Sequence, residues 1–187
     1  AIVRVKKATS KANNELGLLD SKKANAIVRA SDEVLAKKFD DQFVLGKFQA
    51  GSGTPTHMNV NEVIANRASE ILGGSKEKKI VDAHDDVNMG QSTNDVMPTA
   101  MRIASILLLQ ELDESLLELQ KEFEKKSKEF SRILKSGRTH LQDATPITLG
   151  QEFGAYARAL EKNRVRLQDS KKCLRELGIG GTAVGTG

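Results

Sequence analysis

Three polar segments of the 187-residue sequence concentrate the residue types that bind small anions. They are GSGTPTHMN at 51–59, NMGQSTND at 88–95 and GRTHLQDA at 137–144. Glycines let backbone N–H groups approach a ligand, and neutral donors at the start of a helix suit a carboxylate because a helix N-terminus carries partial positive charge. The segments therefore indicate anion binding, although ordinary helix capping by serine, threonine and asparagine explains the first two when each is taken alone.

The third segment contains the candidate for proton transfer, His140. An imidazole exchanges protons near neutral pH, and this one lies in a predicted loop, where burial in an apolar core is disfavoured. A single loop histidine is still more often incidental than catalytic, so its role depends on its neighbours. His57, His84 and His140 are too widely spaced for a metal site, and the single cysteine, Cys173, excludes zinc-finger patterns, so no metal is predicted.

Composition excludes several other classes of protein. There are 29 Lys and Arg residues against 25 Asp and Glu, but no Trp, and no aromatic residue is interleaved with the N-terminal lysines. A solvated basic helix face is therefore favoured over nucleic-acid binding. The longest near-apolar run, 103–109, falls far short of the roughly 20 residues that span a bilayer. One cysteine fits a reducing compartment, so we expect a cytoplasmic protein, or one of the mitochondrial matrix in a eukaryote.

The elements that position these segments are mainly helices. Apolar periodicity predicts helices over 3–16, 21–39 and 56–72, the second capped by Asp20 or Ser21. Residues 40–55 lose this periodicity and end in AGSGTP, which two glycines and a proline should keep out of a helix. A polar loop is expected over 82–94.

Two longer apolar seams follow, which predict long helices packed antiparallel. One runs from Leu109 to Phe130 and the other from Leu149 to Leu167, and residues 136–148 between them form a loop or short ribbon. A two-helix hairpin is not a finished core. We therefore expect an oligomer, further sequence, or both.

Four blocks of sequence, taken together, resemble successive blocks of the fumarase/aspartase superfamily. They are GSGTPTHMNVNEVIANRASEILGG, DDVNMGQSTNDVMPTAMRIA, SGRTHLQDATPITLGQEF and GGTAVGTG. Their order and separation match as well, so the resemblance extends from about Gly17 to the last residue. The joint match is specific, and GGTAVGTG with DATP favours class II fumarases over aspartases.

The resemblance implies a mainly α fold, with a partial N-terminal helical domain at 1–90 and the start of a central long-helix bundle at 91–187. It implies a homotetramer whose active sites are built by several subunits, with a small dicarboxylate substrate and no cofactor. The implied reaction is reversible hydration of fumarate to malate through an aci-carboxylate carbanion. An aspartase, which releases ammonia from aspartate by the same carbanion chemistry, is the nearest alternative.

Roles for individual residues follow from the same resemblance. His140 would activate or position the water, and the residues that would bind substrate are Ser52, Thr54, Ser92, Thr93, Asn94 and Thr139. His84 and Asp85 would belong to a second dicarboxylate site. Many relatives read HPND where this sequence reads DAHD at 82–85. The added carboxylate and the lost proline should weaken that site and loosen its turn.

The family's mobile loop, with the pattern GSSxMPxKxN and the serine assigned as the base, is absent from the 187 residues. We therefore expect this chain to be part of an enzyme and inactive alone. The alternative from another class of protein is a non-catalytic helical assembly module.

Overall fold

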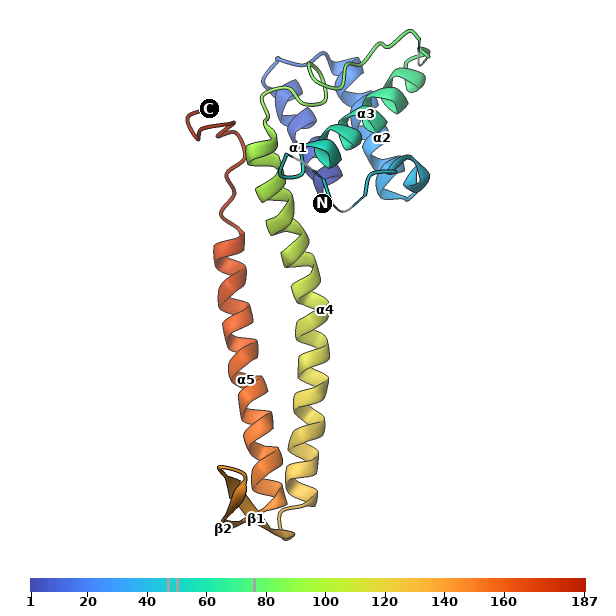
Figure 1. Cartoon of the computed structure of the whole chain (residues 1–187). Helices are drawn as coiled ribbons and strands as arrows, with labels where there is room; N and C mark the ends of the chain where they lie inside the picture. The colour runs from blue at the N-terminus through green and yellow to red at the C-terminus, as the bar shows by residue number, and fades with distance from the viewer. Residues whose placement is uncertain (47, 50, 76) are drawn as a thin grey trace. The chain divides into compact units, whose positions relative to one another are not determined.

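The computed structural model describes residues 1–46, 48–49, 51–75 and 77–187. The described chain is mainly helical, with one antiparallel ribbon (Figure 1). In chain order its elements are α1 (Ile2–Glu15), α2 (Ser21–Leu35), the 3-10 helix η1 (Asp40–Gln42), α3 (Thr54–Ile71), α4 (Thr93–Glu129), β1 (Leu134–Thr139), β2 (Gln142–Thr148) and α5 (Leu149–Leu174). None of the described helices is both long and apolar enough to cross a membrane.

The chain forms two compact units, and α4 contributes to both. The first unit contains residues 1–103 and 177–187, and the second contains residues 104–176. These units are defined by contacts within this chain. The domains expected from the sequence, 1–90 and 91–187, refer to the complete protein, so this division stays a prediction.

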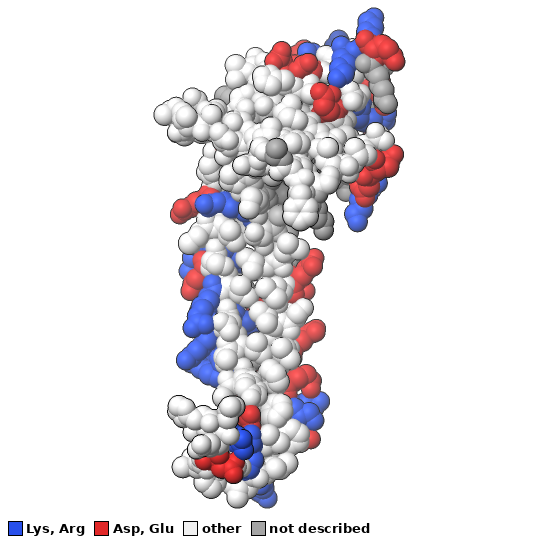
Figure 2. Space-filling view, in the orientation of Figure 1, with Lys and Arg blue, Asp and Glu red and all other residues white. Residues whose placement is uncertain are grey.

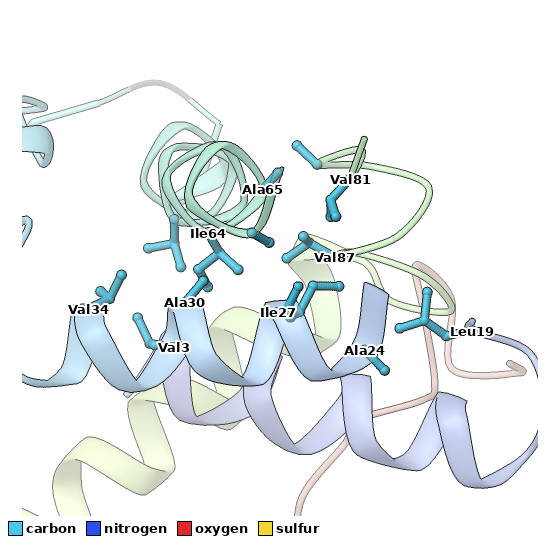
Figure 3. Packing of buried hydrophobic residues seen from close by; sticks show 14 residues of the cluster. Val3, Leu19, Ala24, Ile27, Ala30, Val34, Ile64, Ala65, Val81 and Val87 are labelled. Atoms are coloured by element: carbon cyan, nitrogen blue, oxygen red, sulfur yellow. The ribbon is translucent and has the colours of Figure 1, made fainter. Parts of the chain in front are cut away.

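The core of the first unit lies between α1, α2, α3 and the loop that follows α3 (Figure 3). Ile27 of α2 and Ile64 of α3 are fully buried against Val81 and Val87 of the loop. Buried alanines of α2 and α3 let these two helices approach closely, so Ile27 and Ile64 can pack tightly. Asp20 caps α2, because its carboxylate accepts hydrogen bonds from the backbone N–H groups of Lys22 and Lys23 in the first turn of this helix, at 2.9 and 3.1 Å.

Two predicted boundaries in this unit were wrong. Thr54 and Pro55, predicted to be non-helical, form the first turn of α3, where proline is tolerated because its missing N–H would have no partner. Helix α2 ends at Leu35 instead of residue 39, and Lys37 adopts a left-handed φ of 62°. Residue 50 of the predicted non-helical run lies outside the described residues.

The second unit is an antiparallel helical hairpin, as the two apolar seams predicted. The rings of Phe123 on α4 and Phe153 on α5 lie 5.8 Å apart between centroids, and Phe130 and Tyr156 extend this contact. The segment predicted as a loop or ribbon is the β1–β2 ribbon at the closed end of the hairpin (Figure 1).

The two helices of the hairpin carry net charges of opposite sign. Residues 104–129 of α4 hold seven Asp and Glu against four Lys and Arg, whereas α5 holds three against six. In Figure 2 acidic side chains lie mostly over α4 and basic ones mostly over α5 along this hairpin. Arg164 of α5 donates to Asp113 of α4 at 2.8 Å, and this bond lowers the pKa of the Asp113 carboxyl below its ordinary value.

Gly150 sets how closely the two helices of the hairpin approach. A Cβ atom at this position would lie 2.4 Å from the backbone oxygen of Ser127. The close approach allows the Ser127 hydroxyl to donate to the Gly150 carbonyl at 2.7 Å and the Gly150 N–H to donate to the Phe130 carbonyl at 3.0 Å.

Gly150→Ala should therefore lower the free energy of unfolding by about 1–3 kcal/mol, the usual cost of overpacking. The measurement is urea unfolding at fixed protein concentration. Gly178→Ala is the control, because a Cβ atom there meets nothing within 4 Å. Equal stability of the two variants would contradict the close approach of α4 and α5.

Candidate anion-binding site

The first predicted segment forms a tight left-handed bend before α3. Gly51, Ser52 and Gly53 have φ values of 74°, 52° and 90°. A Cβ atom on Gly53 would lie 2.6 Å from the Cε atom of Met97, so the bend lies against the first turns of α4. The side chains of Ser52 and Thr54 are exposed, and the Thr54 hydroxyl donates to the Gly51 carbonyl at 2.6 Å. The bend therefore places both hydroxyls at the N-terminus of α3, within reach of solvent.

The second predicted segment caps α4 and also binds the C-terminal residues of the chain. Ser92 accepts a hydrogen bond from the Asn94 N–H at 3.2 Å, and Asp95 Oδ1 accepts one from the Ser92 N–H at 3.0 Å. Asp95 Oδ2 accepts two more, from the N–H groups of Gly180 at 3.1 Å and Thr182 at 2.9 Å. The buried Asp95 carboxylate thus holds the glycine-rich C-terminal block at the start of α4.

A buried polar cluster that the sequence did not predict lies behind both helix starts. The Lys6 Nζ atom of α1 lies 2.6 Å from His57 Nε2, 2.7 Å from Asn88 Oδ1 and 2.9 Å from Gln91 Oε1. Lys6 and His57 are completely buried. The available signal was the position of Lys6 on the face of α1 that carries Val3 and Ser10, both also buried.

Burial shifts both bases of this cluster toward their neutral forms. It lowers the pKa of Lys6 from 10.5 to about 7, an effect that the negative charge of Asp95 partly opposes. Burial, followed by the charge of Lys6, lowers the pKa of His57 from 6.5 to about 4, while a hydrogen bond with Asn88 and the charge of Asp95 act in the opposite direction. At neutral pH His57 is therefore uncharged.

The cluster joins the first two predicted segments. His57, which belongs to the first polar segment, lies on the inner face of α3, and its Nδ1 atom lies 2.7 Å from the Thr93 hydroxyl oxygen. Thr93 is the first residue of α4. One hydrogen bond therefore connects the start of α3 to the start of α4. The structure brings Ser52, Thr54 and residues 92–94 into one compact unit.

The third predicted segment lies in the other compact unit, at the tip of the β1–β2 ribbon. Thr139 pairs with Gln142, so His140 and Leu141 form a two-residue turn, with φ values of 49° and 60°. Such turns usually require glycine or asparagine. Arg138 stabilises this turn by donating to the Leu141 carbonyl at 2.9 Å and to Asp143 at 2.7 Å. Both Thr139 and His140 are exposed.

The predicted second-site residues lie in an exposed turn after α3. His84 Nδ1 lies 2.9 Å from Asp85 Oδ1. Asp82 Oδ1 accepts hydrogen bonds from the N–H groups of His84 and Asp85 at 2.7 and 2.8 Å, and these bonds lower the pKa of the Asp82 carboxyl. Asp82 therefore supplies contacts that hold the turn, which the lost proline was expected to loosen. Among the described residues, no group of three His, Cys, Asp or Glu is placed to hold a metal ion.

Comparisons with known proteins agree with this fold. A family model described as lyase matches residues 1–187. A class II fumarate hydratase of Campylobacter jejuni is 54% identical over the whole chain, which covers 41% of that protein. One of Thermus aquaticus is 54% identical over 98% of this chain and 40% of that protein. The chain thus spans about two fifths of the length of these relatives.

Solved structures of similar proteins also match this chain. A recombinant class II fumarase from Schistosoma mansoni matches with a TM-score of 0.93 and 39% identity, over 99% of this chain and 39% of that one. The native form of a fumarate lyase:delta crystallin from Brucella melitensis matches with a TM-score of 0.88 and 46% identity, over 96% of this chain and 42% of that one. The mainly helical fold predicted from the sequence is confirmed.

The buried lysine predicts a pH dependence of stability. Because the folded-state pKa of Lys6 is about 7 and its ordinary value is 10.5, the unfolded chain binds more protons between these values, and stability should rise with pH there. Urea unfolding at pH 7 and pH 9.5 would show wild type gaining stability relative to Lys6→Met. Lys7→Met, at an exposed ion pair on the same helix, is the control. A constant difference between wild type and Lys6→Met would contradict the lowered pKa.

Proposed function

Because the chain belongs to the lyase family, whose model matches residues 1–187, we propose that it is part of a class II fumarate hydratase. The whole enzyme would add water to fumarate reversibly and form malate, with the chain described here supplying one portion of the active site. The observation that supports this most strongly is the joining of two hydroxyl-rich helix starts through Thr93 and His57. The names of the relatives at about 50% identity support the choice of substrate.

The proposed substrate carboxylate binds at these two helix starts. Its hydrogen-bond donors would be the side chains of Ser52, Thr54, Ser92, Thr93 and Asn94. To bind it, the Thr54 hydroxyl and the Asn94 amide would turn away from the carbonyls of Gly51 and Ala183, to which they donate in the absence of substrate. Removal of the C3 proton of malate places negative charge on the adjacent carboxylate, and fixed donors stabilise that charge as it develops. One such donor is worth roughly 3 kcal/mol. The partial positive charge of both helix N-termini acts in the same direction.

We assign a role in handling the attacking water to His140 and a contact with the substrate to Thr139. Their exposed turn, held with positive φ at two non-glycine residues, is the kind of strained backbone that is found at functional sites. His140 would activate or position the water, and Thr139 would bind the substrate. No metal or organic cofactor is required for this chemistry. His84 and Asp85 would form at most a weak second dicarboxylate site, because Asp82 adds negative charge there.

We propose that the enzyme is a cytoplasmic homotetramer, or a homotetramer of the mitochondrial matrix in a eukaryote. The hairpin of α4 and α5 leaves large apolar side chains exposed, which other helices would have to cover. They include Leu107, Leu108, Leu112, Leu119, Tyr156 and Val165. Active sites assembled from several subunits would bring the ribbon tip of one chain to the helix starts of another.

The activity is tested with the complete protein, by following the ultraviolet absorbance of fumarate after addition of malate or aspartate. We expect fumarate to appear with malate and at a far lower rate with aspartate. A dominant rate with aspartate would show an aspartase instead. No turnover of either substrate by the complete protein would favour a non-catalytic assembly role.

His140→Asn should lower the turnover of malate by ~10²–10⁴, the range for a general acid or base. Asparagine tolerates the positive φ at this position, so the turn should be preserved. Leu141→Asn is the matched control, because it changes the adjacent residue of the same turn without removing the imidazole, and its turnover should stay within a few-fold of wild type. If His140→Asn turned over malate at the wild-type rate, His140 would have no part in the reaction.

A further inference from the structure

The Lys6 ammonium has three N–H donors and no acceptor, and the cluster supplies three acceptors for it. They are His57 Nε2, Asn88 Oδ1 and Gln91 Oε1, at 2.6, 2.7 and 2.9 Å. When Lys6 is charged, it can only donate to His57, so the Nε2 atom must carry no hydrogen.

The tautomer of His57 follows from this contact. A neutral imidazole has one N–H, and with Nε2 accepting from Lys6 the hydrogen is on Nδ1. The Nδ1–H group then donates to the Thr93 hydroxyl oxygen, 2.7 Å away. Because that oxygen accepts, its own hydrogen is left available for an acceptor outside the cluster. Thr93 is only half-buried and begins α4, so such an acceptor can approach from solvent.

The opposite arrangement arises when Lys6 is neutral. An amine has a lone pair, so it can accept a hydrogen from His57 Nε2, which leaves Nδ1 bare. The Thr93 hydroxyl would then donate inward to Nδ1 and would no longer offer its hydrogen to a ligand. The titratable groups that act on Lys6 are His57 from α3 and Asp95 from α4, whereas Asn88 and Gln91 from the preceding loop are neutral.

We propose that Lys6 is a positioning residue that acts through His57 to direct the hydroxyl hydrogen of Thr93 outward, toward a carboxylate of the substrate. The inference rests on the proposed function, because it takes Thr93 as a contact of a bound dicarboxylate. Lys6 itself touches no substrate. Its contribution is the direction of one hydrogen bond at the start of α4.

The test measures binding of succinate, a dicarboxylate that cannot be hydrated, to the complete protein by calorimetry at pH 6.5. Lys6→Met removes the charge and the donors, and Lys7→Met is the matched control on the same helix. Loss of one hydrogen bond to a charged ligand should raise the Kd for succinate roughly 10-fold or more in Lys6→Met. The Kd of Lys7→Met should stay within about twofold of wild type, because Lys7 pairs with Asp32 outside the cluster.

A double-mutant cycle with Thr93→Val separates positioning from a general structural role. Once the hydroxyl is gone, Lys6→Met should change the Kd for succinate no further. Full additivity of the two substitutions would overturn the inference, as would unchanged binding by Lys6→Met.

The pH profile gives a second measurement that does not require Lys6→Met to fold. The Kd of wild type should rise between pH 6.5 and pH 8.5 as Lys6 loses its proton, and that of Thr93→Val should not. Parallel profiles for the two proteins would overturn the inference.

Turnover of malate, measured in parallel, distinguishes the two proposals. A wild type that turns over malate while Lys6→Met and Thr93→Val behave additively contradicts only the role of Lys6. A wild type that shows the predicted coupling in succinate binding but no turnover of malate contradicts only the proposed function.

Discussion

The burial of the Lys6 ammonium is the constraint on which the candidate site depends. A charged lysine leaves water only where its donors are satisfied, and here the acceptors come from α3 and from the loop before α4. Removing any one acceptor would leave an unpaired donor in the core of the first unit. The cluster therefore fixes α1, the start of α3 and the start of α4 relative to one another. Burial lowers the pKa of Lys6, so the arrangement carries an electrostatic cost.

The same constraint explains why two helices begin side by side. Left-handed residues before α3 allow the bend to lie against Met97, and the His57–Thr93 bond then joins the two helix starts. Asp95 extends the arrangement to the C-terminal block by accepting from Gly180 and Thr182. Hydroxyl side chains from both helix starts consequently belong to one compact unit. A site of this kind suits a dianion whose charge is redistributed during the reaction.

Much of the fold could be predicted from the sequence, because long apolar seams and helix caps are local signals. The seam from Leu109 to Phe130 indicated α4, and the polar break before Leu149 indicated the ribbon. The predicted end of α2 was wrong, because apolar periodicity contains no information on a left-handed residue such as Lys37. The three polar segments were also visible, because glycine, serine, threonine and asparagine cluster in them.

The buried cluster could not be predicted, because it depends on tertiary contacts. Lys6 lies 51 positions from His57 and 82 from Asn88 in the sequence, and nothing local indicates that they meet. His57 was expected within the helix over 56–72, but helical periodicity alone does not show that its imidazole meets Lys6 and Thr93. The roles of individual site residues stay predictions, since hydroxyls that cap a helix and hydroxyls that bind a ligand have the same sequence pattern.

We propose that the starts of α3 and α4 form one carboxylate site. A crystal structure of the complete protein with bound fumarate tests it most directly. We expect a fumarate carboxylate within hydrogen-bond distance of the Thr93 hydroxyl and of donors from both helix starts, with His57 Nδ1 still in contact with Thr93. Fumarate bound elsewhere, with the two helix starts occupied only by water, would contradict it.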